Sequence, residues 1–302
     1  MNDARRTYEA SNLRSFFDDQ IHHLQGLVGN LSNQRKNARL QSNEEKQILE
    51  NFIDTVNGKM RAVKDYSEKL EQSVCTLYQH ILQVAAQIPQ PIDLNPDTFR
   101  TDPLVNSLFV NTDDIDRLFE TCPEVSAYLR DNSQQQVPVV YALLTACKSE
   151  KSKLGSGMVG DMLVREISQQ AVNFSSHKLR EPCAGVEELN SALKKYLFDS
   201  IVTLVKQEMS SRIAEQALNP GDNSFESRVK SLANPDVYLK TLLELLANPA
   251  NLLRIEKTHY KLNKLGIKIA DDDSQCANEF DIHELTWSNN TRNVILQIAY
   301  TL

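Results

Sequence analysis

The stretch that decides the fold is residues 49–88, which read LENFIDTVNGKMRAVKDYSEKLEQSVCTLYQHILQVAAQI. Its apolar residues recur every three or four positions, the spacing that places side chains along one face of an α-helix. We expect a single long helix here, about 60 Å in length at ~1.5 Å per residue. The interaction seam predicted on its apolar face consists of Val56, Met60, Val63, Leu70, Val74, Leu77 and Ile81.

A shorter amphipathic segment precedes this helix, with apolar residues between Leu13 and Leu31 on one face. Ser42 and Glu45, between the two segments, have the spacing of a capping box at a helix start. Residues 1–88 are therefore expected to form a long helical hairpin or coiled coil. Two alternatives stay open for the seam: the chain's own first helix covers it, or a second copy or a partner does.

The rest of the chain predicts a mixture of helices and strands. Four prolines within residues 89–103 indicate a linker, and residues 104–302 are expected to form an α+β domain. Runs of β-forming residues predict a strand pair within residues 138–174, and the alternation over 293–301 predicts a C-terminal β-hairpin. The expected fold class is α+β and predominantly helical, with the N-terminal hairpin or coiled coil followed by a mostly antiparallel sheet.

Two Asn-Pro pairs indicate helix starts in the second half of the chain. Asn234-Pro235 and Asn248-Pro249 each place an N-cap residue before a proline at the first helical position. We expect a leucine-rich helix after each pair, the second ending near Gly266, which is suited to a helix C-terminus. Residues 186–218 carry a further apolar stripe and are predicted to be helical.

The charge balance argues against a nucleic-acid-binding function. The chain has 33 Lys+Arg and 40 Asp+Glu, a net charge of −7. The acidic excess is spread along it: residues 1–103 hold 12 basic and 14 acidic side chains (net −2), and residues 104–302 hold 21 and 26 (net −5). Dedicated nucleic-acid binders carry a basic patch or a basic balance.

Cysteine usage and hydropathy point to a reducing, aqueous compartment. The five cysteines form no CxxC pair, so neither a disulfide framework nor a structural zinc site is expected. The first residues lack the apolar core of a signal peptide, and the longest apolar stretch, residues 137–147, is too short to cross a membrane. We therefore expect a cytoplasmic protein with no membrane contact.

Two patterns resemble functional motifs without their structural context. Residues 155–160 match G-x-G-x-x-G, but a polar, basic segment precedes them and a strand-like segment follows, which indicates a turn between strands. Cys147, His177 and Asp161 are the residue types of a catalytic trio, yet Cys147 lies in an apolar strand where a thiol is inert. We predict no catalytic residue, no cofactor and no metal ligand.

These observations favour an interaction or scaffold protein over an enzyme. We expect it to self-associate or to bind a protein partner through residues 10–88. The alternative is an enzyme or small-ligand binder with a site in the α+β domain near residues 147–178. A third and weaker hypothesis is a nucleic-acid accessory factor that uses the basic strip Lys148, Lys151 and Lys153.

Overall fold

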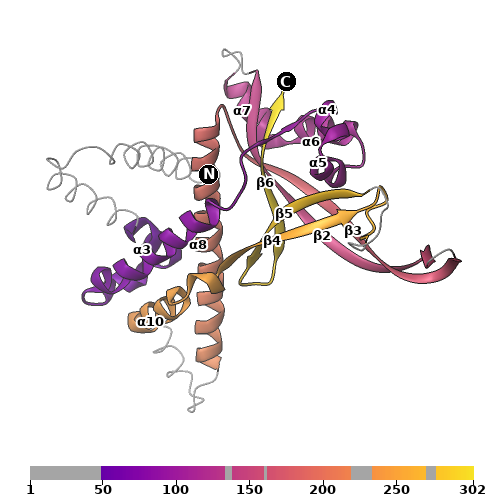
Figure 1. Ribbon diagram of the computed structural model, residues 1–302. Helices are drawn as coiled ribbons and strands as arrows, with labels where there is room; N and C mark the ends of the chain where they lie inside the picture. Colours follow the sequence, from indigo (N-terminus) through magenta and orange to yellow (C-terminus); the bar gives the residue numbers. More distant parts are fainter. Residues whose placement is uncertain (1–48, 133–137, 160–161, 219–232, 270–276) are drawn as a thin grey trace, which may run out of the picture. The chain divides into compact units, whose positions relative to one another are not determined.

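The computed structural model describes residues 49–132, 138–159, 162–218, 233–269 and 277–302 (Figure 1). The chain divides into two compact units, each built from two separate segments of sequence. Unit 1 comprises residues 1–85 and 191–253, and unit 2 comprises residues 86–190 and 254–302. Each unit is described by itself below.

The prediction of one long helix over residues 49–88 is wrong, because the helix is interrupted between residues 57 and 65. We refer to this interruption as the break. Residues 49–56 are helical, and Asn57 then becomes extended (φ −170°) and accepts a hydrogen bond from the Lys59 backbone N–H at 3.0 Å. The short 3₁₀ helix η3 (Gly58–Ala62) follows, and Asp65 has a positive φ of 57°. Helix α3 (Tyr66–Ala85) begins only after this turn.

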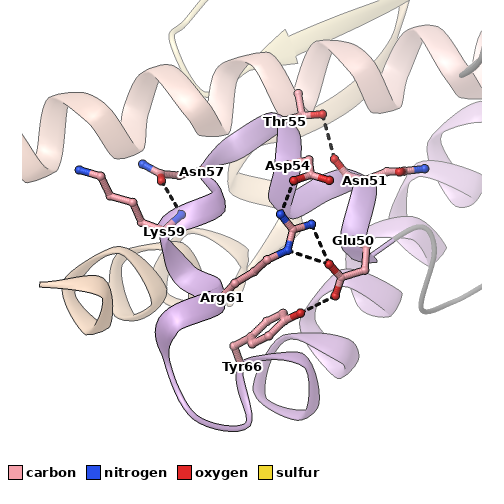
Figure 2. Close-up of polar contacts among 8 residues, drawn as sticks. All are labelled: Glu50, Asn51, Asp54, Thr55, Asn57, Lys59, Arg61 and Tyr66. Atoms are coloured by element: carbon pink, nitrogen blue, oxygen red, sulfur yellow. Dashed lines mark hydrogen bonds and ion pairs between the residues drawn. The ribbon is translucent and has the colours of Figure 1, made fainter. Parts of the chain in front are cut away.

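A polar clasp holds the two sides of the break together (Figure 2). The Arg61 guanidinium donates to Glu50 Oε2 at 3.0 and 2.8 Å and also pairs with Asp54, while the Tyr66 hydroxyl donates to Glu50 Oε1 at 2.6 Å. The hydrogen bond from Tyr66 lowers the pKa of Glu50, and the one from Arg61 lowers the pKa of Asp54. These contacts fix the chain in a folded-back conformation that a continuous helix cannot adopt.

Unit 1 buries the apolar faces of its helices against one another. Phe52 and Phe198 form an edge-to-face pair with ring centroids 6.2 Å apart, and His80 Nε2 lies 2.8 Å from the Leu253 carbonyl oxygen. The elements that carry most of the seam, η3 and α3, also contact elements of the segment 191–253. The elements of this segment are α8 (Val186–Leu218), whose first residues belong to unit 2, α10 (Pro235–Leu246) and the 3₁₀ turn η4 (Pro249–Asn251).

The prediction of an N-terminal helical hairpin or coiled coil is therefore wrong for the residues that the structure describes. The shorter first helix and the capping box at Ser42 and Glu45 lie outside the described residues. The part that is described, residues 49–85, folds as two helical segments joined by a turn and packs with residues 191–253 of the same chain. The regular apolar spacing reflects burial in a local core rather than one long rod.

Four short helices and a sheet form unit 2, and the helices begin where polar or proline residues set their starts. Asn95, Asp102 and Asn111 accept backbone N–H bonds as N-caps, and proline occupies the first turn of three helices. The helices pack on one face of the sheet through a shared apolar core that includes Leu104, Phe119 and Ile298. They are α4 (Pro96–Thr101), α5 (Pro103–Leu108), α6 (Thr112–Thr121) and α7 (Pro123–Asp131).

The sheet of unit 2 has six strands, arranged β3-β2-β6-β5-β4, with β1 parallel to β6. Strands β2 and β6 pair antiparallel from Val139↔Thr301 to Ala146↔Val294. Strands β5 and β6 pair around the turn at residues 288–291, where the sequence predicts a hairpin. The strands are β1 (Ile92–Leu94), β2 (Val139–Val159), β3 (Met162–Cys183), β4 (Leu253–Leu262), β5 (Asn278–Trp287) and β6 (Arg292–Thr301).

A return segment after β4 closes the sheet into a hydrogen-bonded ring. Residues 266–268 turn back along β4 and bridge β3 at Ala171↔Ile267. The Val172 N–H donates to the Gly266 carbonyl at 2.7 Å, and the Lys268 N–H donates to the Gln170 carbonyl at 2.8 Å. Strand β3 is therefore bonded on both sides at this level of the sheet.

The helix predicted to follow Asn248-Pro249 is also wrong. Asn248 does cap a helical turn, but only η4 forms, and the chain continues as strand β4. Ile255, Thr258 and Tyr260 are residue types that favour strands, and Tyr260 and Leu262 alternate into the unit 2 core. Gly266 has a φ of +71° and forms the turn into the return segment rather than ending a helix.

Candidate functional site

Five ionisable side chains of unit 2 meet where β2 leaves the sheet. Lys148 donates to Glu284 Oε2 at 2.8 Å and to the Tyr260 hydroxyl at 2.9 Å. Tyr260 donates to Glu150 Oε1 at 2.6 Å, and Lys268 donates to Glu150 Oε2 at 2.6 Å. We refer to Lys148, Glu150, Tyr260, Lys268 and Glu284 as the charged cluster.

Strand periodicity explains how residues so distant in sequence come together. Lys148 and Glu150 are two positions apart on β2, so their side chains leave the same face. Glu284 continues the inward row of Phe280 and Ile282 on β5. Tyr260 faces inward from β4, and the return segment brings Lys268 beside it.

The Tyr260 ring lies at the centre of the charged cluster. The Nζ atoms of Lys148 and Lys268 are 5.4 and 5.1 Å from its centroid, within cation–π range. Burial and the hydrogen bond to Glu150 raise the pKa of Tyr260. Hydrogen bonds from Lys268 and then Tyr260 lower the pKa of Glu150 to about 2.

Lys148 is the most enclosed cation of the charged cluster, with 11% of its side chain exposed. Burial alone would favour its neutral amine, but the bonds to Glu284 and Tyr260 outweigh burial and raise its pKa. The charged side chains of this cluster are paired with one another. Its chemistry is that of an internal clamp, which costs desolvation but ties β2, β4, β5 and the return segment together.

Beyond the charged cluster, β2 and β3 continue as a two-stranded ribbon. Pairing with β6 ends at Ala146, and the last bridge from the return segment is at Ala171. The strands then pair with each other from Lys153↔Gln169 to Val159↔Met162. Figure 1 shows this ribbon running past the ends of β4 and β5. Seven residues of β2, 153–159, span about 20 Å at ~3.3 Å each.

One face of β2 and β3 carries lysines and no carboxylate. From Thr145↔Lys178 to Lys153↔Gln169, paired residues share a face, and Lys151, Lys153 and Lys178 are exposed on it. In the described part of the chain, no ion pair involves these three lysines. We refer to this surface as the cationic face; its other members are Thr145, Cys147, Ser149, Gln169, Ala171, Asn173 and Ser175.

The residue types of a catalytic trio are not assembled. Cys147 is exposed on the cationic face, with Sγ 4.0 Å from Asn293 Oδ1. His177 faces the helices instead and stacks on Phe109, the residue that follows α5, with ring centroids 4.8 Å apart. Burial lowers the pKa of His177, which therefore stays neutral near pH 7. Asp161 lies outside the described residues.

All seven seam residues are buried in unit 1, none more than 8% exposed. Val56 immediately precedes the break, Met60 and Val63 lie within it, and the rest lie on α3. A partner contact through them stays a prediction.

The other sequence motifs, as far as the structure describes them, form no binding site. The first five residues of the G-x-G-x-x-G match, 155–159, belong to β2 and lead into a hairpin rather than a helix. Among the described residues, no three His, Cys, Asp or Glu side chains are grouped to hold a metal ion. None of the helices in the described ranges combines the length and apolarity needed to cross a bilayer.

Comparison with protein-family models, curated proteins and solved structures gives no match to this chain.

The sequence did contain a signal for the charged cluster. Glu284 interrupts an inward apolar row, and Lys148 and Glu150 alternate directly after the apolar run of β2. A charged residue at an inward strand position needs a partner of opposite charge. Which partner it finds depends on the ring of strands, which no local pattern predicts.

Proposed function

We propose that the chain is a cytoplasmic protein-interaction protein whose contact surface is the β2–β3 ribbon of unit 2. The observation that carries the proposal is the ribbon's extension past the sheet, over residues 153–159 and 162–169. A two-stranded ribbon is marginally stable alone and leaves both strand edges open to pairing. Extended strands with open edges are common sites of protein recognition.

The charged cluster supports the proposal because it stiffens the base of the ribbon. Lys148 and Glu150 belong to the ribbon strand, and their partners come from β4, β5 and the return segment. A buried ion pair contributes little net stability, but it specifies one arrangement of the groups around it. A defined ribbon direction lowers the entropy cost of binding.

This proposal is favoured over a small-ligand or catalytic site near residues 147–178. The charges of the cluster are paired with one another, and His177 is stacked against a helix while Cys147 is on the opposite face. The proposal also differs from an N-terminal contact, since the seam residues on residues 49–85 are occupied by the core of unit 1.

The test compares the intact chain with a variant in which Asn-Gly replaces residues 153–169. Ser152 and Gln170 are directly paired, so a two-residue turn can join them and leave the charged cluster in place. Both proteins are used as baits in native lysate, and bound proteins are quantified by mass spectrometry. A partner bound by the intact chain and lost with the ribbon supports the proposal. Equal recovery of the partner by both baits would overturn the proposal, provided that the shortened variant unfolds at the same temperature as the intact chain.

A further inference from the structure

We infer that the cationic face binds an acidic, extended segment of a partner protein. The inference rests on the proposed function and specifies the class of partner. Its basis is a surface of one charge sign within a chain whose net charge is −7.

The register of β2 and β3 separates the charges of this strand pair between its two faces. Lys151 and Lys153 pair with Ala171 and Gln169, and Lys178 pairs with Thr145, so this face receives no carboxylate. Glu150 leaves the opposite face and is bonded to Lys268. The lysines are thus not neutralised by the nearest acid of their own strand.

The spacing of the lysines matches an extended polypeptide. Lys151 and Lys153 are two residues apart on one strand, about 6.6 Å at ~3.3 Å per residue. An extended partner presents alternate side chains on one side with the same period. Carboxylates at every second position of such a segment therefore meet Lys151 and Lys153, and the neighbouring pair Ser149 and Asn173 adds hydrogen-bonding groups beside Lys151.

A short acidic segment fits this surface better than nucleic acid. Residues 1–103 and residues 104–302 each carry a net negative charge, which repels a long polyanion, whereas a short segment interacts mainly with charges within a Debye length of about 8–10 Å. The cationic face has no aromatic ring for base stacking, and Arg180, which follows Lys178 on the same face of β3, is paired with Glu124. A second copy of the same face would bring lysine against lysine.

The experiment uses the full chain and two labelled peptides, one alternating Glu and Thr and the other alternating Lys and Thr. Binding is followed by fluorescence anisotropy at low and at moderate salt. The test variant is K151E/K153E, which reverses the cationic face. The matched control is K206E/K240E, which makes the same charge change at exposed positions on α8 and α10.

We expect saturable binding of the Glu/Thr peptide that weakens with salt, no binding of the Lys/Thr peptide, and at least about a tenfold loss of affinity in K151E/K153E. The control variant should bind as the intact chain does. Equal affinity of the two variants would overturn the inference. Tighter binding of a DNA duplex than of the Glu/Thr peptide, lost in K151E/K153E, would also overturn it and assign the face to nucleic acid.

Two further outcomes separate this inference from the proposed function. If K151E/K153E self-associates and the intact chain binds no peptide, the lysines serve to block edge-to-edge pairing, and the inference fails. If the lysate partner is lost with the shortened ribbon but retained by K151E/K153E, the ribbon is the contact surface and the acidic-segment inference alone fails. Retention by both variants removes the proposed function as well.

Discussion

The Nζ atom of Lys148 lies 2.8 Å from Oε2 of Glu284, and the two side chains are 11% and 3% exposed. These residues are 136 positions apart in the chain and come from β2 and β5. Their pairing joins the strand that forms the ribbon to the strand that lines the core. Each charge is tolerated inside unit 2 because the other is present.

Removing one member of this pair should destabilise unit 2 far more than removing both. Lys148→Met leaves the Glu284 carboxylate buried without its cation, at an expected cost of about 3–5 kcal/mol. The double variant K148M/E284L replaces both charges with apolar groups and should lose much less. Urea unfolding of both single variants and the double variant measures the coupling. Additive losses would contradict the buried pair.

Acid should weaken the charged cluster through Glu150. Its pKa falls from 4.5 in the unfolded chain to about 2 in the folded protein, so the ionised form stabilises the fold. This contribution is fully present above pH 4.5 and is lost as the pH falls towards 2. Because 33% of the side chain is exposed, solvent reduces its size.

The variant Glu150→Gln isolates this effect. Its unfolding free energy should lie below that of the intact chain at neutral pH, and the two should converge between pH 4.5 and 2. Chemical denaturation across this pH range measures the difference. A gap that stays constant with pH would show that Glu150 does not titrate with a lowered pKa.

Tyr260→Phe should show how much the central hydroxyl contributes. The change keeps the ring beside Phe280 but removes the group that accepts from Lys148 and donates to Glu150. We expect a loss of about 1–3 kcal/mol, since two charged partners, Lys148 and Glu150, each lose a hydrogen bond. Tyr238→Phe is the control, because it removes a tyrosine hydroxyl from unit 1, where it accepts a bond of 3.4 Å from Lys59, and leaves the charged cluster unchanged. An equal loss in both would contradict the special role of Tyr260.

The seam residues of α3 should behave as core residues of unit 1. Leu70 and Leu77 are fully buried, so Leu70→Ala or Leu77→Ala should cost about 2–5 kcal/mol of unfolding free energy. Glu71→Ala, at an exposed position of the same helix, should change it by about 0.5 kcal/mol or less. Thermal unfolding of the isolated protein compares them. Wild-type stability of the leucine variants, with loss of self-association, would instead support an intermolecular seam.

Gly266→Ala should open the ring of strands. Gly266 has a φ of +71°, and an added Cβ would lie 2.7 Å from the Val172 carbonyl oxygen. The backbone must shift to relieve this contact, which weakens the bond from the Val172 N–H to the Gly266 carbonyl. Hydrogen exchange at Val172 should become faster, while Gly185→Ala, which meets nothing within 4 Å, serves as the control. Unchanged protection at Val172 would contradict the closure.

Local patterns predicted the elements whose partners are near in sequence. The alternation of Val294, Leu296 and Ile298 marks β6 because these residues line the core of unit 2; the residues between them are buried as well. The Asn-Pro start at Asn234 likewise marks α10. In these elements a short segment contains enough information to decide between helix and strand.

The errors arose where distant contacts decide the structure. The apolar spacing of residues 49–88 persists across the break, and the clasp of Arg61 with Glu50 and Asp54 joins residues that a straight helix holds apart. The Asn248-Pro249 start is satisfied by a single turn, after which pairing with β5 outweighs the helical tendency. The charged cluster depends on the same long-range pairing, so spacing alone does not reveal it.

Each unit is built from an early and a late segment of the sequence, and this arrangement limits the order in which the chain can fold. Unit 1 needs residues 191–253 to cover α3, and unit 2 needs β6 before β1 has a strand to pair with. During synthesis, the early segments of both units must wait for residues made much later, and closing loops of this length slows folding. A proteolytic cut after residue 103 would break the covalent link of α3 to the rest of unit 1 and of β1 and α4 to the rest of unit 2, so one cut would affect both units.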